Sequence, residues 1–171
     1  ILTTAGPYEK YGTPLVALCA AYGTHLSDIT GESDWVRTMI DNYELQAKES
    51  GAIITSMAGH DCTPWDLSVL NAVNMMKSKF NKEVTRIDVY DRVSGAISGG
   101  TLATILNSLI GREKYKAKLG FDPLISFHGA KQTTDFKVEN QAVLGFDKKI
   151  DQFVGPFVMA QVMGNCIRRT A

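Results

Sequence analysis

The sequence has no excess of either charge, because 18 Lys and Arg residues balance 18 Asp and Glu residues. A neutral chain without a long basic run gives no electrostatic reason to bind nucleic acid or an anionic membrane. It also lacks an apolar run close to the ~20 residues of a membrane helix, and it lacks the basic and apolar start of a signal peptide. These absences predict a cytoplasmic protein with no transmembrane segment and no nucleic-acid partner.

Cysteine and histidine are both scarce. The three cysteines, Cys19, Cys62 and Cys166, are odd in number and far apart, which indicates reduced thiols rather than a disulfide framework. Cys19 lies in an apolar segment and is expected in the core. His25 and His128 have no second ligand at metal spacing, so no metal site is predicted.

A starting methionine is also missing. Residues 1–5, Ile-Leu-Thr-Thr-Ala, resemble the middle of a buried strand, and the last residues, Arg-Arg-Thr-Ala, contain no stop signal for a helix. We therefore expect the sequence to be a piece of a longer polypeptide.

The first half contains alternating strand and helix signals. Apolar, β-prone runs are followed each time by a cap residue and a helical apolar pattern, and the first two helices end at glycine. Strands are expected at 1–5, 25–29 and 52–55. Thr13 and Ser33 are the expected caps of two helices that end at Gly23 and Gly51, and a third helix is expected at 67–80. This order predicts βαβ units, a parallel sheet and an α/β fold that resembles a doubly wound one. An apolar stripe of Val36, Ile40, Tyr43 and Ala47 indicates the buried face of the second helix.

The pattern changes after Phe80. Residues 83–93 alternate between apolar and polar side chains, which predicts a strand of an antiparallel or mixed sheet with one wet face. Further elements are a helix at 102–109, strands at 136–138 and 142–146, and a helix at 156–169. A parallel half followed by an α+β half places a domain boundary near Phe80, giving domains 1–80 and 81–171.

The turn between the third strand and the third helix concentrates polar residues. His60, Asp61, Cys62, Thr63 and Asp66 lie within seven positions, and ligands bind beyond the carboxyl ends of strands in parallel α/β sheets. Helix capping is the alternative, since Thr63 and Asp66 fit a capping box and a proline follows the threonine. Capping does not explain His60, Asp61 or Cys62.

Four segments, read together, resemble the saccharopine dehydrogenase-like oxidoreductases. They are GPYEKYGTPLV after Ala5, HLSDITGE from His25, GHDCTPWDL from Gly59, and PFVMA with RRT from Pro156 onward. They span nearly the whole chain in the family's order. The closest branch is the one that contains the trans-acting enoyl reductases and the lipid-associated saccharopine dehydrogenase-like proteins.

The resemblance implies a Rossmann domain followed by an α/β domain with substrate contacts and often a dimer interface. Residues 1–80 then form the second part of a Rossmann-like NAD(P)-binding domain, and residues 81–171 form an incomplete substrate-binding or dimerisation domain. A homodimer is what the resemblance implies. The sequence contains no G-x-G-x-x-G, whose backbone N–H groups hold a pyrophosphate. NADP or NAD is therefore the expected cofactor, but this chain alone is not expected to hold it.

The same resemblance implies which residues meet the cofactor. The turn at Gly6 and Pro7 passes near the nicotinamide half, and the glycine leaves room for the nucleotide. Asp28 is expected either to accept hydrogen bonds from ligand hydroxyls or to cap Gly31 or the next helix. The predicted cofactor-binding residues are Ala5, Gly6, Pro7, Tyr8, Gly12, Asp28 and Gly59.

Asp61 matches the family's aspartate in the central turn, where a proton donor or orienting group is needed. His60 replaces the usual phenylalanine, and it is either a proton shuttle or a loop residue without a catalytic role. The predicted substrate-binding residues are Asp66, Gly100, Thr101 and Arg168. The glycine and threonine can equally serve the turn that opens a helix, and Arg168 can simply offset a helix dipole.

Two functions of different classes follow. The first is an NAD(P)-dependent oxidoreductase that moves hydride to a C=C or C=N bond, with an enoyl group on a small or lipid-like substrate as the preferred acceptor. The second is a noncatalytic dimerisation or lipid-associated module on a Rossmann-like scaffold, which the replaced residues His60, Cys62 and Thr63 favour. A reductase that forms saccharopine would need several basic groups near its turns, and the sequence has few there.

Overall fold

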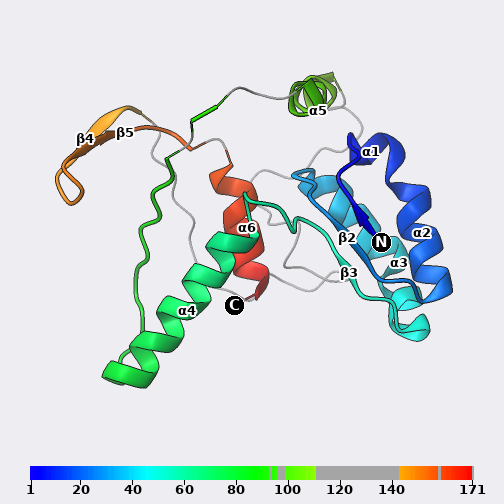
Figure 1. Cartoon of the computed structure of the whole chain (residues 1–171), viewed down its shortest axis with the longest axis horizontal. Helices are drawn as coiled ribbons and strands as arrows, with labels where there is room; N and C mark the ends of the chain where they lie inside the picture. The colour runs from blue at the N-terminus through cyan, green and yellow to red at the C-terminus, as the bar shows by residue number, and fades with distance from the viewer. Residues whose placement is uncertain (93, 96–98, 111–142, 158, 171) are drawn as a thin grey trace.

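The computed structural model describes residues 1–92, 94–95, 99–110, 143–157 and 159–170 as a mixture of helices and short strands (Figure 1). In chain order the elements are β1 (Leu2–Thr3), α1 (Tyr8–Tyr11), α2 (Thr13–Tyr22), β2 (Leu26–Asp28), α3 (Ser33–Ser50), β3 (Ile54–Thr55), α4 (Thr63–Phe80), α5 (Gly99–Ile110), β4 (Gly145–Asp147), β5 (Gln152–Val154) and α6 (Ala160–Thr170).

The first three strands form one parallel sheet in the order β1-β2-β3. Leu2 pairs with Ser27, and Leu26 pairs with Ile54. The predicted parallel sheet is therefore confirmed. Helices α2 and α3 pack closely on each other, so they cover the same face of this sheet (Figure 1). Neither supplies the second layer of a doubly wound fold, and the Rossmann-like assignment stays a prediction.

The C-terminal ends of α2 and α3 follow the sequence prediction. Gly23 and Gly51 adopt the left-handed conformation, with φ of 67° and 77°, and each backbone N–H bonds to a carbonyl of the last helical turn. Glycine adopts this conformation without the steric cost of a Cβ. Both predicted stops are confirmed.

The predicted N-caps are wrong by one position. Thr13, Ser33 and Thr63 are each the first residue of their helix rather than the cap, and no side-chain cap bond is formed. The hydroxyl of Thr13 instead accepts a hydrogen bond of 3.0 Å from Trp35 Nε1. A tertiary contact between α2 and α3 thus takes the group that the local pattern assigned to capping.

The core lies between the sheet, α2 and α3. Its buried members are Tyr8, Val16, Cys19, Leu26, Trp35, Val36, Met39, Met57 and Cys62. The predicted stripe on α3 packs here, since Val36 and Ala47 are buried and Ile40 and Tyr43 are partly buried. Val162 and Cys166 of α6 also pack against this cluster, so the end of the chain contributes to the core of its first half.

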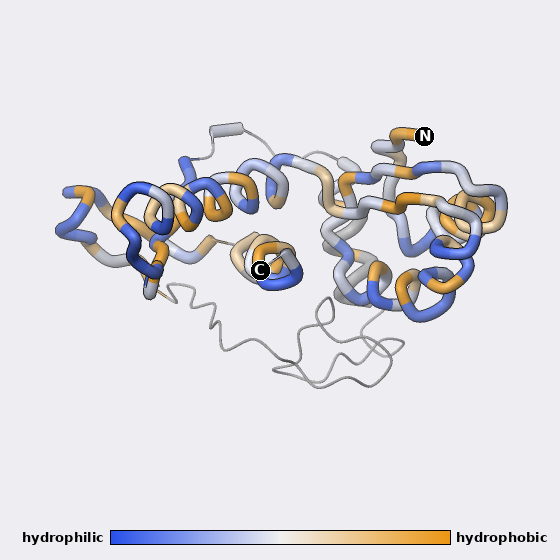
Figure 2. The backbone as a smooth tube through the Cα atoms, turned by 90° about the horizontal axis from the view of Figure 1, so that it is seen from below, coloured by the Kyte–Doolittle hydropathy of each residue, from blue (hydrophilic) through white to orange (hydrophobic). Residues whose placement is uncertain are grey.

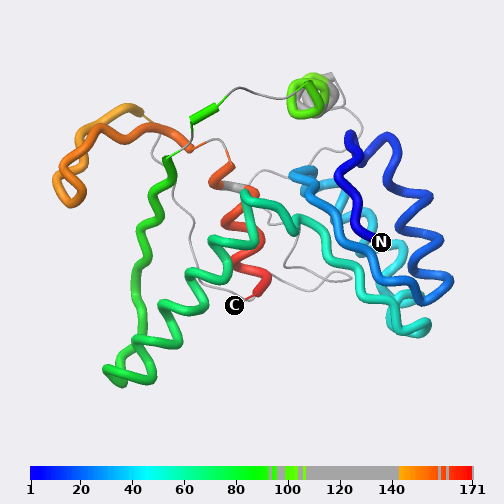
Figure 3. Tube along the Cα trace, in the orientation of Figure 1, coloured from blue at the N-terminus to red at the C-terminus, as the bar shows by residue number. Residues whose placement is uncertain are grey.

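Residues 83–92 run away from the end of α4 toward the β4–β5 hairpin (Figure 3). They form no strand, so the strand predicted at 83–93 is wrong for the described part (Figure 1). Their side chains nevertheless keep the predicted period of two. Lys149 Nζ bonds to Asp88 Oδ2 at 2.6 Å, and Tyr90 Oη donates to Asp147 Oδ2 at 2.7 Å. The polar face contacts the β4–β5 hairpin through side chains, and the backbone of 83–92 pairs with no strand among the described residues.

Strands β4 and β5 form an antiparallel hairpin, which confirms the kind of sheet expected in the second half. The strand predicted at 142–146 begins at Gly145, and the one at 136–138 lies outside the described residues. Helix α5 begins at Gly99, and α6 begins at Ala160 instead of Pro156. Hydrophobic and hydrophilic residues alternate along α4 (Figure 2), and none of its residues is buried. No helix in the described part has the length and apolar character to cross a bilayer.

Candidate functional site

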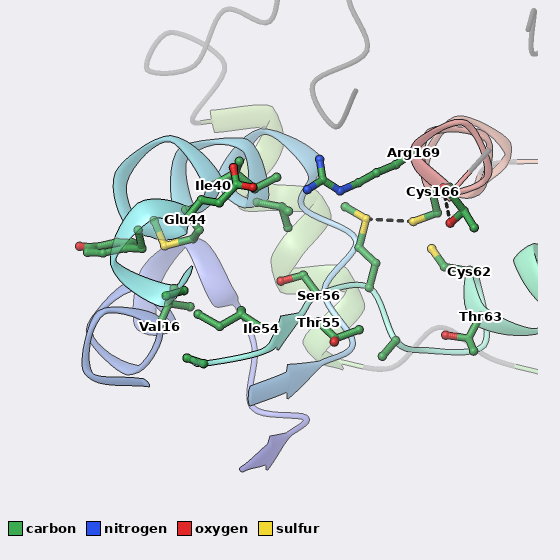
Figure 4. A pocket seen from close by; sticks show the side chains of 18 of the residues that line it. Val16, Ile40, Glu44, Ile54, Thr55, Ser56, Cys62, Thr63, Cys166 and Arg169 are labelled. Carbon is green, nitrogen blue, oxygen red and sulfur yellow. Dashed lines mark hydrogen bonds between the residues drawn. The ribbon is translucent and has the colours of Figure 1, made fainter. Parts of the chain in front are cut away.

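A cavity of about 550 Å³ lies between α3, β3 and the ends of α4 and α6 (Figure 4). Its apolar wall includes Val36, Met39, Ile40, Tyr43, Ala47, Ile54 and Met57. Its polar wall includes Ser56, Thr63, Asp66, Arg169 and Thr170. Ligand sites in proteins have this range of volume, with mostly apolar walls and a few placed polar groups.

Asp28 organises the chain beneath this cavity. The residue is only 1% exposed. Its Oδ1 accepts hydrogen bonds from the backbone N–H of Thr30 at 3.0 Å and of Met57 at 3.3 Å, and its Oδ2 accepts one from Ser56 Oγ at 2.8 Å. The carboxylate therefore joins the carboxyl ends of β2 and β3. It is committed to these three donors and is not directed at a ligand.

The turn around Pro7 is likewise committed to internal bonds. The Gly6–Pro7 peptide is cis. The carboxylate of Glu32 accepts hydrogen bonds from the backbone N–H of Tyr8 at 3.2 Å and of Glu9 at 2.6 Å. Tyr8 is 6% exposed, and burial, together with nearby carboxylates, raises the pKa of its phenol. The first donors of α1 are thus already used, and they do not face a cofactor phosphate.

Gly12 is required by packing. A Cβ at this position would lie 2.7 Å from Trp35 Cζ2 and 2.8 Å from the carbonyl oxygen of Tyr8. Both neighbours belong to the buried core and cannot move freely. The role of Gly12 in this structure is to let α1, α2 and α3 meet.

Replacing Gly12 with Ala is therefore expected to lower the free energy of unfolding by about 1–3 kcal/mol, the range for an overpacked core. Urea denaturation followed by far-ultraviolet circular dichroism measures the change. Gly95→Ala is the matched control, because a Cβ there meets nothing within 4 Å. Equal stability of the two variants would contradict the packing role.

The residues predicted to bind cofactor do not form one cleft. None of the seven lines the 550 Å³ cavity. Gly6 lies against the Tyr8 ring, which a Cβ on the glycine would meet at 3.3 Å, and a Cβ on Gly59 would meet Ile29 at 3.2 Å. Ala5 is exposed, and its N–H bonds to Thr3 Oγ1. These residues alone do not fit a dinucleotide.

The two predicted catalytic residues lie beside the cavity. Asp61 is exposed and lines a separate hollow of about 10 Å³, together with Gly59 and Met159. A space of that size holds about one water molecule. His60 is also exposed, and its ring meets the edge of Trp65 at a centroid distance of 6.1 Å. Asp61 has no hydrogen-bond partner in the described part of the chain.

Of the predicted substrate-binding residues, only Asp66 lines the cavity. Its Oδ2 accepts a hydrogen bond of 2.8 Å from Thr170 Oγ1, which joins α4 to α6. Gly100 and Thr101 are exposed at the start of α5. Arg168 donates to Asn165 Oδ1 at 2.7 Å within its own helix, an arrangement that agrees with the helix-end alternative.

Sequence reasoning considered both arginines at the end of the last helix and chose Arg168, but Arg169 is the one that lines the cavity (Figure 4). Glu44, a charged cavity residue, was missed. Glu44 Oε1 pairs with Lys48 Nζ at 2.9 Å, while its shielded Oε2 has no partner among the described residues. The signal for Glu44 was present, because it lies four residues after Ile40 on the apolar stripe. Burying a carboxylate at such a position costs free energy of folding unless a cation or a hydrogen-bond donor pairs with it.

No group of three or more His, Cys, Asp or Glu side chains in the described ranges is placed to hold a metal ion.

Comparison with known proteins finds relatives, but no family model and no solved structure matches this chain. One relative is a protein of Mycobacterium tuberculosis (strain ATCC 25618 / H37Rv) that is provisionally named a trans-acting enoyl reductase. It is 43% identical over 110 residues, which are 64% of this chain and 26% of that protein. The trans-acting enoyl reductases of Mycobacterium bovis (strain BCG / Pasteur 1173P2) and Mycobacterium ulcerans (strain Agy99) are each 41% identical over 106 residues, 61% of this chain and 25% of theirs.

The match thus spans about a quarter of the length of these curated relatives. The resemblance to proteins of the trans-acting enoyl reductase branch is confirmed at this level of identity. Membership of the wider saccharopine dehydrogenase-like family stays a prediction.

Proposed function

We propose that this chain is the acyl-binding part of an NAD(P)-dependent oxidoreductase that reduces a C=C bond of an enoyl substrate. The observation that carries the proposal is the 41–43% identity to proteins named trans-acting enoyl reductases. The parallel sheet of the first half suits a Rossmann-like domain. The substrate would be lipid-like. A C=N bond, in place of the C=C bond, is the less favoured hydride acceptor.

The cavity supports the acyl part of the proposal. The side chains of α3 offer an apolar surface along which an alkyl chain loses contact with water. Thr63, Asp66 and Arg169 lie together on the polar wall, and hydroxyl and guanidinium groups donate hydrogen bonds to a thioester carbonyl. The chain of the substrate would thus lie against α3, with its carbonyl end toward α4 and α6.

The cofactor belongs to the proposal in a limited way. When bound, a nicotinamide supplies the hydride. The seven residues predicted to hold it do not fit it by themselves. We therefore propose that the loop that binds its phosphates lies in a part of the full-length polypeptide other than these residues. The relatives are about four times as long as the matched segment, which leaves room for such a loop.

Acyl binding is testable on this chain without any cofactor. A fluorescent long-chain fatty acid is expected to bind saturably. Ala52→Leu, which adds bulk to the cavity wall, is expected to weaken binding about tenfold, the effect of a few methylene groups in an apolar pocket. Ala21→Leu, on the exposed surface of α2, is the matched control and should bind like the wild type. Absence of saturable binding, or equal affinities in the two variants, would contradict an acyl site here.

One observation favours the noncatalytic module. Asp28, Tyr8 and Gly12, three of the predicted cofactor residues, serve internal packing and hydrogen bonding. Exposed apolar side chains on α4, Leu67, Leu70, Val73 and Met75, offer a surface for a second copy or a lipid-bearing partner. A polypeptide that extends this chain to the length of its relatives decides the matter: NADPH consumption with an enoyl thioester supports the reductase, and its absence supports the module.

A further inference from the structure

We propose that Cys62 and Cys166 form a thiol–disulfide pair that, when oxidised, ties the start of α4 covalently to α6. The two residues are 104 positions apart in the sequence, yet both line the 550 Å³ cavity. Their sulfur atoms face each other in Figure 4. The proposal concerns thiol chemistry and does not depend on the reductase assignment.

Three sulfur groups gather at this place. Cys166 Sγ lies 3.3 Å from Met57 Sδ and donates to it, because a thioether can only accept. The Cys62 thiol lies beside the Cys166 thiol (Figure 4), and both residues line the cavity. The two thiols therefore lie close enough to influence each other.

The two thiols differ in reactivity. Cys62 is 4% exposed, and the hydrogen bond to Cys166, together with burial, raises the pKa of its thiol far above the ordinary value. Cys62 is therefore shielded from an oxidant in solution. Cys166 is half-buried and reachable. Oxidation consequently begins at Cys166, and Cys62 is the resolving thiol beside it.

The chemistry balances with a peroxide as the oxidant. Hydrogen peroxide transfers one oxygen to the Cys166 thiol, giving a sulfenic acid and one water. The sulfur of Cys62 then attacks the sulfenic sulfur, the S–S bond forms, and the second oxygen leaves as water with the Cys62 proton. In total two thiols are oxidised by two electrons, and one peroxide is reduced to two waters.

The bridge has a structural consequence at the cavity. Cys62 immediately precedes Thr63, and Cys166 lies one turn before Thr170 on α6; both threonines line the polar wall. Helices α4 and α6 already pack on each other, and a hydrogen bond runs from Thr170 to Asp66 between them. A covalent link beside it would hold this wall in one arrangement.

Mass spectrometry tests the proposal directly on the wild-type chain. After treatment with hydrogen peroxide, we expect the intact mass to be lower by two hydrogen atoms. Denaturation and alkylation should then give a Cys62–Cys166 linked peptide and an alkyl group at Cys19 only. Cys19 is the internal control, since it is buried and does not line the cavity that Cys62 and Cys166 share. Dithiothreitol should restore three alkylated thiols. The melting temperature should rise by several degrees on oxidation, because the bridge closes a loop of about 100 residues in the unfolded chain.

Variants separate the roles of the two sulfurs. Cys62→Ser should leave a sulfenic acid on Cys166 that dimedone traps, and Cys166→Ser should form no disulfide. Cys19→Ser should behave like the wild type. Three alkylatable thiols after peroxide, a disulfide through Cys19, or dimers linked between chains would each overturn the proposal. The mass measurement on the wild-type chain distinguishes these outcomes even if a variant does not fold.

Discussion

Replacing Asp28 with Ala is expected to lower the free energy of unfolding by roughly 3 kcal/mol or more, enough to unfold a marginally stable domain. The carboxylate of Asp28 accepts from two backbone N–H groups and the Ser56 hydroxyl while 1% exposed. Alanine leaves all three donors without their acceptor. Each unsatisfied buried donor costs about 1–3 kcal/mol.

The loss should also be local in its structural effect. Met57 has a φ of 61°, an unusual conformation for a residue with a Cβ, and its N–H is one of the three donors. Without the carboxylate, the segment loses two of the bonds that hold this conformation, so residues 56–62 are expected to lose their arrangement first. Hydrogen exchange at the amides of Thr30 and Met57 reports this directly.

Two matched variants make the test specific. Ser56→Ala removes only one of the three bonds and is expected to cost about 1 kcal/mol. Asp28→Asn keeps the shape but presents an NH₂ group to a donor, so its cost should lie between the other two. Urea denaturation gives the three values. Equal stability of Asp28→Ala and Ser56→Ala would show that the carboxylate is not the organising group.

The parts of the fold that sequence reasoning predicted are those decided by local chemistry. Strand and helix alternate at a spacing that only parallel crossovers accommodate. Gly23 and Gly51 end their helices because the left-handed conformation there favours glycine. The stripe on α3 is read from a period of 3.6 residues. Each of these features is confirmed because it depends on neighbours in the chain.

The strand predicted at 83–93 failed for a reason that the sequence does not show. Alternation of polar and apolar residues reports that two sides of an extended chain differ, but not whether its backbone pairs. Here Asp88 and Tyr90 contact Lys149 and Asp147 through side chains, more than fifty residues away. Nothing local distinguishes this arrangement from a sheet.

In the candidate site, too, sequence reasoning predicted the features that depend on neighbours in the chain and missed contacts between elements. The turn after β3 was predicted to be functional, and one of its predicted ligand residues, Asp66, lies in the cavity wall. The capping box predicted for Thr63 and Asp66 is wrong, because Thr63 is already the first residue of α4 and Cys62 occupies the N-cap position. The bonds from Glu32 to α1 and from Asp28 to Ser56 cross between elements. Spacing along the chain carries no information about such contacts.

Replacing Asp61 with Asn is expected to lower the turnover of an enoyl thioester by about 10² or more, the usual contribution of a positioned proton donor or acceptor. The assay follows NADPH consumption in a polypeptide that extends this chain to the length of its relatives. Asp61 follows β3, at the edge of the sheet where ligands bind in parallel α/β folds. Its side chain is exposed and has no hydrogen-bond partner among the residues that the structure describes.

This makes the test clean, because asparagine at this position removes no hydrogen bond within the described part of the chain. The melting temperature of Asp61→Asn should equal that of the wild type, so lost turnover cannot come from unfolding. Asp66→Asn is the comparison. Its amide oxygen still accepts from Thr170, and we expect a higher KM with kcat little changed, as for a group that only binds substrate. If Asp61→Asn turns over normally while Asp66→Asn loses kcat, the reacting carboxylate lies inside the 550 Å³ cavity, and the exposed turn beside it has no part in the chemistry.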